Sequence, residues 1–219
     1  MLVIGLAGGV ASGKSWVARC FEHLGARILD ADQIGHEVLK QPDVFAAIVS
    51  QWGEQVVSNE EINRSALGRV VFGSNQGDTS QLQILEQITH PRIGQLIGQE
   101  LANLTRDSKT AESGIPAVIL DAPVMFKAGW DQLCDKIVFI ETEISVRQQR
   151  ARARGWSPDE IRRRESFQTP INEKRKRSTD IIQNSNSKIE TYKQACGLWQ
   201  KWNLDLPSDP TPPSTLLST

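Results

Sequence analysis

The sequence predicts an α/β fold in three layers, with helices on both faces of a parallel five-stranded sheet. Short apolar runs alternate with segments of helical periodicity, which is typical of parallel strands joined by crossover helices. A glycine-rich stretch separates the first apolar run from a helix expected from about Gly13 to Leu24, where apolar residues recur every three or four positions. The expected strands are Leu2–Ala7, Arg27–Asp30, Ala117–Asp121, Lys136–Glu141 and Thr179–Gln183.

The glycine-rich stretch has the pattern of a phosphate-binding P-loop. Residues 8–15 read G-G-V-A-S-G-K-S, which fits G-x-x-x-x-G-K-S between a strand and a helix. Glycines let backbone N–H groups converge on an anion, and the N-terminus of the next helix adds positive potential. Lys14 is expected to reach the β- and γ-phosphates of ATP, and the Ser15 hydroxyl to ligate Mg²⁺. The predicted fold is therefore that of a P-loop NTPase. The expected ATP-binding residues of this loop are Gly8, Gly9, Val10, Ala11, Ser12, Gly13, Lys14, Ser15 and Trp16.

The composition is that of a globular protein with balanced charge. The 219 residues, 39% of them hydrophobic, suffice for one core with an inserted subdomain, and a net charge of −1 does not favour nucleic acid or a membrane surface. No apolar run has the length of a transmembrane helix, and no basic stretch marks a signal peptide. Cys20, Cys134 and Cys196 match no disulfide or zinc spacing. We expect a cytoplasmic protein that is a monomer or a weak homo-oligomer.

Two carboxylates follow the second expected strand. Alternation along the strand predicts that Asp30 and Asp32 lie on one side at the carboxyl edge of the sheet. A carboxylate there can orient an attacking hydroxyl group and accept its proton. Alternatively, either residue caps the helix expected from Gln33. We favour the catalytic role for Asp32 and the capping role for Asp30.

Helical signals dominate between residues 33 and 114 and predict a helical insertion. The expected helices are Gln33–Leu39, Asp43–Trp52, Ser65–Phe72 and Gln81–Leu104. The polar segment Asp107–Gly114 is expected to be a loop. An insertion after the carboxyl end of a strand is a natural place to bind a second substrate. His90 is either a structural, hydrogen-bonded residue or a contact to that substrate.

The third expected strand, Ala117–Asp121, also ends in a carboxylate. Apolar residues followed by Asp are similar to a Walker B strand, whose Asp belongs to the Mg²⁺ shell. Many strands end in Asp without binding a metal. Asp121 therefore either contacts the metal shell through water or only caps the strand, and the pattern favours neither.

Basic residues are concentrated between residues 147 and 177, a segment that contains eleven Lys or Arg and four Asp or Glu. Arginines stabilise the negative charge that phosphoryl transfer spreads over the transition state. Arg150 and Arg154 are four residues apart and share a helix face, and Pro158 can begin a second helix after Gly155. This pattern predicts a lid. The alternatives are a solvated basic surface and a nucleic-acid patch, and the lack of interleaved aromatic residues disfavours the latter.

The expected organisation is one P-loop kinase domain. Its parts are a core at about 1–32, 115–145 and 178–205, an insertion that binds the acceptor at about 33–114, a lid at about 146–177, and a tail at 206–219. The tail is rich in Pro, Ser and Thr and is expected to be disordered.

In their order and spacing, these motifs resemble the dephospho-coenzyme A kinase family from about Leu2 to Asn184. Beyond the P-loop, the matching segments are Asp30-Ala31-Asp32, Asn63-Arg64-Ser65-Ala66-Leu67 with Val71-Phe72, His90-Pro91-Arg92-Ile93, Gln168-Thr169-Pro170 with Lys174-Arg175, and Ile181-Ile182-Gln183-Asn184. The chain departs from the family at Trp16 for Thr, Lys127 for Glu, Arg147 for a frequent Gln, and Ser178-Thr179 for Ala-Asp.

The resemblance implies Mg²⁺-dependent transfer of the γ-phosphoryl group of ATP to the ribose 3′-hydroxyl of dephospho-coenzyme A, the last step of coenzyme A biosynthesis. It implies that the catalytic residues are Asp32, Lys14 and Arg150. Arg150, Arg154 and Asn184 would complete the ATP site, and Asp32, Arg64, His90 and Arg92 would contact the acceptor. The alternatives are another small-molecule or nucleotide kinase with the same plan, and a regulator that binds ATP without transferring phosphate.

Overall fold

The computed structural model describes residues 1–73, 80–110 and 114–214 of the chain. The chain divides into two compact units: Met1–Asp30 with Leu101–Thr219 makes the first, and Ala31–Glu100 makes the second. Within the described ranges, no helix combines the length and the apolar character that crossing a membrane requires.

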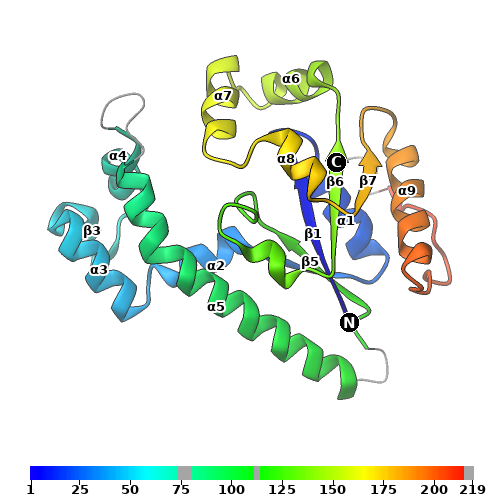
Figure 1. Ribbon diagram of the computed structural model, residues 1–219, viewed down its shortest axis with the longest axis horizontal. Coiled ribbons are helices and arrows are strands. Elements are labelled where there is room, and N and C mark those ends of the chain that lie inside the picture. Colours follow the sequence, from blue (N-terminus) through cyan, green and yellow to red (C-terminus); the bar gives the residue numbers. More distant parts are fainter. Residues whose placement is uncertain (74–79, 111–113, 215–219) are drawn as a thin grey trace. The chain divides into compact units, whose positions relative to one another are not determined.

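The first unit contains the predicted parallel sheet of five strands. Its order is β2-β5-β1-β6-β7, so β1 is central and pairs with both β5 and β6 (Figure 1). The strands are β1 (Leu2–Gly8), β2 (Arg27–Asp30), β5 (Ala117–Asp121), β6 (Lys136–Glu141) and β7 (Asp180–Gln183). Most residues of β1, β5 and β6 are buried, as expected for inner strands that form continuous apolar runs in the sequence.

Helices α1 (Lys14–His23) and α9 (Lys188–Lys201) contribute to a core cluster with this sheet. The ring of Phe21 on α1 stacks on that of Trp199 on α9, with centroids 6.0 Å apart. Both side chains are fully buried, so they anchor the two helices to each other, and α1 also contacts β1 while α9 contacts β7.

Three further helices, α6 (Ile144–Ala153), α7 (Pro158–Ser166) and α8 (Ile171–Lys176), lie between β6 and β7 in the sequence, and a 3-10 turn, η2 (Trp130–Leu133), precedes β6. Helix α7 begins at Pro158, as predicted. The side chain of Ser157 caps it by accepting a hydrogen bond from the backbone N–H of Glu160 at 3.1 Å.

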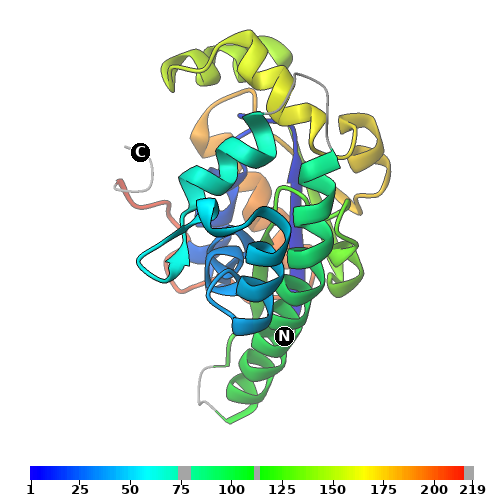
Figure 2. The same cartoon turned by 90° about the vertical axis from the view of Figure 1, so that its left-hand side faces the viewer.

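The second unit is mainly helical, as predicted, but it also contains a short hairpin. Its helices are α2 (Ala31–Val38), α3 (Pro42–Trp52), α4 (Arg64–Gly73) and the part of α5 (Ser80–Thr110) up to Glu100. A 3-10 turn, η1 (Glu54–Val56), leads into the hairpin of β3 (Val57–Ser58) and β4 (Glu61–Ile62), which is cyan in Figure 2. Strands of two residues are too short to show a periodic pattern, so the sequence did not reveal them.

The prediction of a loop at Asp107–Gly114 is wrong for its first residues, because α5 continues to Thr110. Leu101 and Leu104 are buried, so a one-sided apolar pattern extends the helix although its other residues are polar. Residues 111–113 lie outside the described part of the chain.

The disorder expected for the tail from Leu206 stays a prediction. Leu206 packs against the core cluster, and the carbonyl oxygen of Thr211 lies 3.2 Å from Nε2 of His23. Residues 215–219 lie outside the described part of the chain.

Candidate active site

The P-loop joins the end of β1 to the first turn of α1, and its backbone at Gly13 adopts a conformation that favours glycine. Gly13 has a φ of 90°, and a Cβ atom there would lie 2.3 Å from Nδ2 of Asn184. The N–H groups of Trp16 and Val17 donate to the carbonyl oxygen of Gly13 at 3.0 and 3.2 Å, which closes the first turn of α1. The sequence pattern thus forms the strand, loop and helix that a phosphate site needs.

Three side chains converge on the carbonyl oxygen of Ser12 in the second half of the loop. Asn184 Nδ2 donates to this oxygen at 2.7 Å, Thr142 Oγ1 at 2.9 Å and Arg150 Nη1 at 3.1 Å. Nη2 of Arg150 also donates to the carbonyl oxygen of Asn184 at 2.9 Å. Arg150 and Asn184 therefore contact the P-loop, and their hydrogen bonds go to backbone oxygens and fix the shape of the loop. No sequence pattern pointed to Thr142.

The first half of the loop is bound by residues that the sequence analysis did not single out for this role. The N–H of Val10 donates to Oε1 of Glu165 at 3.2 Å. Arg147 Nη1 pairs with the same carboxylate oxygen and donates to the carbonyl oxygen of Val10 at 3.3 Å. These contacts join α6 and α7 to the loop across more than 130 positions of sequence, so no local pattern could have revealed them.

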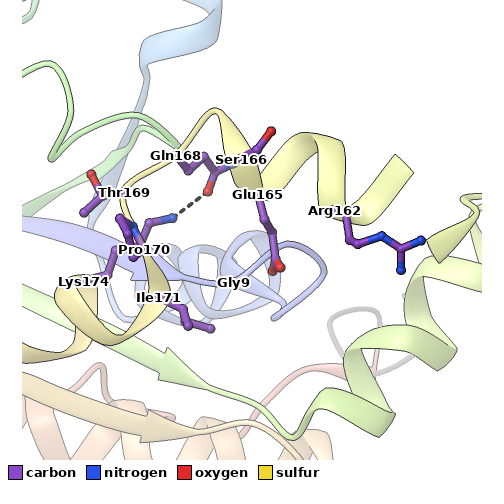
Figure 3. Close-up of a pocket in the computed structure, with 9 residues that line it drawn as sticks. All are labelled: Gly9, Arg162, Glu165, Ser166, Gln168, Thr169, Pro170, Ile171 and Lys174. Atoms are coloured by element: carbon purple, nitrogen blue, oxygen red, sulfur yellow. Dashed lines mark hydrogen bonds between the residues drawn. The ribbon is translucent and has the colours of Figure 1, made fainter. Parts of the chain in front are cut away.

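Lys174 on α8 approaches the same part of the loop. Its Nζ donates to Gln168 Oε1 at 2.6 Å, drawn as the dashed line in Figure 3, and to the carbonyl oxygen of Gly8 at 3.3 Å. The pKa of Lys174 is lowered to about 8, chiefly by burial and next by the positive charge of Lys14, while Glu165 opposes this shift and Arg147 adds to it. An anion bound here would relieve this repulsion between cations.

A cavity of about 390 Å³ opens beside Gly9, between the loop and the segment from α7 to α8 (Figure 3). Its lining residues are Gly9, Arg162, Glu165, Ser166, Gln168, Thr169, Pro170, Ile171 and Lys174. In Figure 3 the side chain of Glu165 points toward the P-loop, whereas that of Arg162 points away from it. The cavity places basic and hydroxyl side chains next to backbone N–H groups, which suits a phosphate-bearing ligand.

The remaining predicted ATP residues of this unit lie at helix ends. Lys14 and Ser15 begin α1, with Lys14 half-buried and Ser15 exposed. Trp16 follows them, and its ring lies 5.1 Å from the ammonium group of Lys188. Arg154 is the exposed residue that directly follows α6, and its guanidinium group lies 5.4 Å from the ring of Trp156. Most of the neighbouring arginines are exposed, as expected for a solvated surface.

The residues proposed for Mg²⁺ offer oxygen donors, which this ion prefers. Ser15 presents a hydroxyl group in the first turn of α1, and Asp121 ends β5 in register with Asp30, which ends β2. Among the described residues, no group of three or more His, Cys, Asp or Glu could hold a metal ion. The donor set therefore fits an ion that takes most of its ligands from phosphates and water, as Mg²⁺ does in nucleotide sites.

Asp32 is not on a strand, and the expectation from strand alternation is wrong. Strand β2 ends at Asp30 and α2 begins at Ala31, so Asp32 lies exposed in the first turn of a helix. An aspartate there is stabilised by the positive end of the helix. Asp32 still follows closely after the carboxyl end of β2, but the direction of its side chain is set by the helix and not by the strand.

The other predicted acceptor residues also belong to the second unit. Arg64 is the exposed first residue of α4, and His90 lies half-buried within α5, directly before Pro91. Arg92 donates from Nε to Oε1 of Gln41 at 3.0 Å, which ties α5 to the start of α3. Arg92 also donates from Nη1 to Oε1 of Gln95 at 2.6 Å. A ligand could replace these hydrogen bonds to neutral glutamine side chains at a modest cost in free energy.

The chain is similar to known proteins along most of its length. A family model described as dephospho-CoA kinase matches residues 2–190. A dephospho-CoA kinase from Carboxydothermus hydrogenoformans is 35% identical, and the match covers 91% of this chain and 94% of that protein. One from Geobacter metallireducens is 37% identical, with 92% and 96% covered. The crystal structure of TT1252 from Thermus thermophilus is 29% identical, covers 93% of this chain and 98% of that chain, and has a TM-score of 0.75.

Proposed function

The chain belongs to the dephospho-CoA kinase family, and we propose how its own residues perform the phosphoryl transfer of that family. The substrates of this reaction are ATP and dephospho-CoA, and its products are ADP and coenzyme A. The observation that carries the assignment of residues is the P-loop, whose backbone is fixed by side chains from α6 and from the segments that follow β6 and β7. We assign ATP to the first unit and the acceptor to the second.

The P-loop holds the phosphates of ATP through its backbone N–H groups and Lys14. Gly13 supports this role, because its left-handed backbone turns the loop into the N-terminus of α1. Arg150 and Asn184 hold the loop in shape through the carbonyl oxygen of Ser12. Mg²⁺ held by Ser15 would neutralise charge on the β- and γ-phosphates, with Asp121 in its outer shell through water.

The transfer is an in-line displacement at the γ-phosphorus. The ribose 3′-oxygen of dephospho-CoA forms a bond to phosphorus while the bond to the oxygen bridging the β- and γ-phosphates breaks. ADP leaves with that electron pair, and Asp32 takes the proton of the 3′-hydroxyl group. Arg64, His90 and Arg92 would hold the acceptor, while Arg150 and Arg154 stabilise the negative charge on the moving group and help exclude water.

An acceptor panel tests this function. ADP release is measured from Mg²⁺·ATP with dephospho-CoA, AMP, shikimate, pantothenate or no acceptor, and the organic product is identified by mass spectrometry. We expect rapid release only with dephospho-CoA and a product of the mass of coenzyme A. Faster release with another acceptor would overturn the substrate and keep the P-loop chemistry. Tight ATP binding without acceptor-dependent release would favour a regulator.

A further inference from the structure

We infer that Arg147 is a further contact to the γ-phosphoryl group of ATP, and that the carboxylate of Glu165 occupies the place of that group until ATP displaces it. The inference rests on the proposed function in one respect: it takes the P-loop as the site of the ATP phosphates. It adds two residues to that site, one at a position where the family often has Gln.

The first observation is the carboxylate on the P-loop backbone. Amide N–H groups of such loops bind phosphate oxygens, and here the N–H of Val10 donates to Oε1 of Glu165 at 3.2 Å. A carboxylate is the protein group most similar to a phosphate in charge and in acceptor geometry. Glu165 comes from α7, in the lid region, so its side chain can leave the loop if α7 moves.

The second observation is the placement of Arg147. A Cβ atom on Gly9 would lie 2.3 Å from Nη1 and 2.8 Å from Cζ of Arg147, so the guanidinium group lies directly on the loop backbone. The residue is 8% exposed, and its Nε finds no hydrogen-bond partner among the residues that the structure describes. A buried guanidinium group with a free donor is suited to bind a second anion oxygen, as phosphate would offer.

The third observation is the group of cations near Glu165. The positive charges of Lys14 and Arg147 both lower the pKa of Lys174. The negative charge of Glu165 raises this pKa and so opposes them. A γ-phosphoryl group carries more negative charge and more acceptor oxygens than one carboxylate, so it would interact more strongly with these cations. Exchange of Glu165 for phosphate therefore gains interaction energy at Arg147 and Val10.

A structural role is the alternative, in which the Arg147–Glu165 ion pair only fastens α7 to α6. The two roles differ in which nucleotide they affect. A purely structural pair would change the binding of ATP and ADP alike. A placeholder for the γ-phosphoryl group would change the binding of ATP and leave ADP nearly unaffected.

The test is isothermal titration calorimetry with two Mg²⁺-bound nucleotides, ADP and the ATP analogue with an imido group between the β- and γ-phosphorus. In Glu165→Gln, we expect the analogue to bind at least about threefold more tightly and ADP to change less than twofold. In Arg147→Gln, we expect the analogue to bind about tenfold or more weakly, with ADP again little changed.

Glu160→Gln is the matched control. This carboxylate lies on the same helix and pairs with Arg163 and Arg164, so its loss should leave both affinities unchanged. Glu165→Asp is a second variant if Glu165→Gln fails to fold. It keeps the charge but shortens the side chain, and should also favour the analogue.

Equal changes for both nucleotides, or weaker analogue binding in folded Glu165→Gln, would overturn the inference. An unchanged ratio of the two affinities in Arg147→Gln would do the same. If the wild-type chain binds neither nucleotide, the proposed function fails instead, so the two failures are distinguishable.

Discussion

Asp32 is exposed in the first turn of α2, next to the positive end of that helix. Asp32→Asn keeps the size of the side chain and removes its ability to take a proton. We expect kcat to fall by about 10²–10⁴-fold while the KM for ATP changes little, because the P-loop is untouched. Steady-state kinetics with dephospho-CoA measure both values.

Asp30→Asn is the neighbouring control for this variant. Asp30 ends β2 and is also exposed, but we favour a capping role for it and expect a much smaller loss of kcat. A kcat near the wild-type value in Asp32→Asn would remove Asp32 from the chemical step. A larger loss in Asp30→Asn than in Asp32→Asn would move the role to Asp30.

Lys174 gives the folded chain a measurable dependence on pH. Its pKa is lowered from the usual 10.5 to about 8, first by burial and then by Lys14. Between these two values the unfolded chain holds a proton that the folded chain has lost. This residue therefore raises the free energy of unfolding by up to about 3 kcal/mol as the pH rises across this window. Below the window Lys174 is protonated in both states, so it causes no dependence of the free energy of unfolding on pH.

Lys174→Met removes this titration. Urea unfolding at several values between pH 8 and 10 should show the rise in the wild type and a flatter profile in the variant. Lys176→Met, an exposed neighbour on α8, is the matched control and should keep the wild-type slope. Parallel profiles for wild type and Lys174→Met would contradict the lowered pKa.

At the scale of elements, α9 depends on its N-terminal capping box. Ser187 Oγ accepts a hydrogen bond from the N–H of Glu190 at 3.2 Å, and the Glu190 carboxylate accepts one from the N–H of Ser187 at 3.2 Å. We expect Ser187→Ala to lower the free energy of unfolding by about 1 kcal/mol, measured by urea denaturation.

The control for the cap is Ser50→Ala on α3. Ser50 is an exposed residue inside that helix, and its change should stay within about 0.5 kcal/mol. A loss in Ser187→Ala no larger than in Ser50→Ala would show that α9 is held by its buried face alone, through residues such as Trp199.

The sequence predicted those elements whose signals are local. β1, the P-loop and α1 follow one another within 23 residues, so apolar runs, glycines and helical spacing suffice to place them. The hairpin of β3 and β4 and the last turns of α5 were not predicted, because a two-residue strand has no period and polar residues also form helices.

The candidate site divides in the same way. Lys14 and Ser15 could be assigned from the motif, and the direction of Asp32 could not, because one residue decides whether it continues a strand or begins a helix. The contact of Glu165 with Val10 spans 155 positions and depends on where α7 folds back on the loop. Only tertiary packing makes an acidic residue in a basic segment part of the phosphate site.

At the scale of the whole molecule, we propose that the two units supply different parts of one reaction. The first contains the sheet, the P-loop and the basic residues around it, and the second contains Asp32 and the proposed acceptor residues Arg64, His90 and Arg92. The chain passes from one to the other at Asp30 and again within α5. We therefore expect the first unit to determine nucleotide binding and the second to determine the choice of acceptor.

The most direct test of this account follows the γ-phosphorus of ATP. Mg²⁺·ATP labelled at that position is incubated with dephospho-CoA, and the label is traced to coenzyme A or to inorganic phosphate, in the wild type and in Lys14→Ala. The account predicts label in the 3′-phosphate of coenzyme A in equal amount to the ADP formed, and almost none in Lys14→Ala. Label released mainly as inorganic phosphate, at a rate independent of dephospho-CoA, would contradict it.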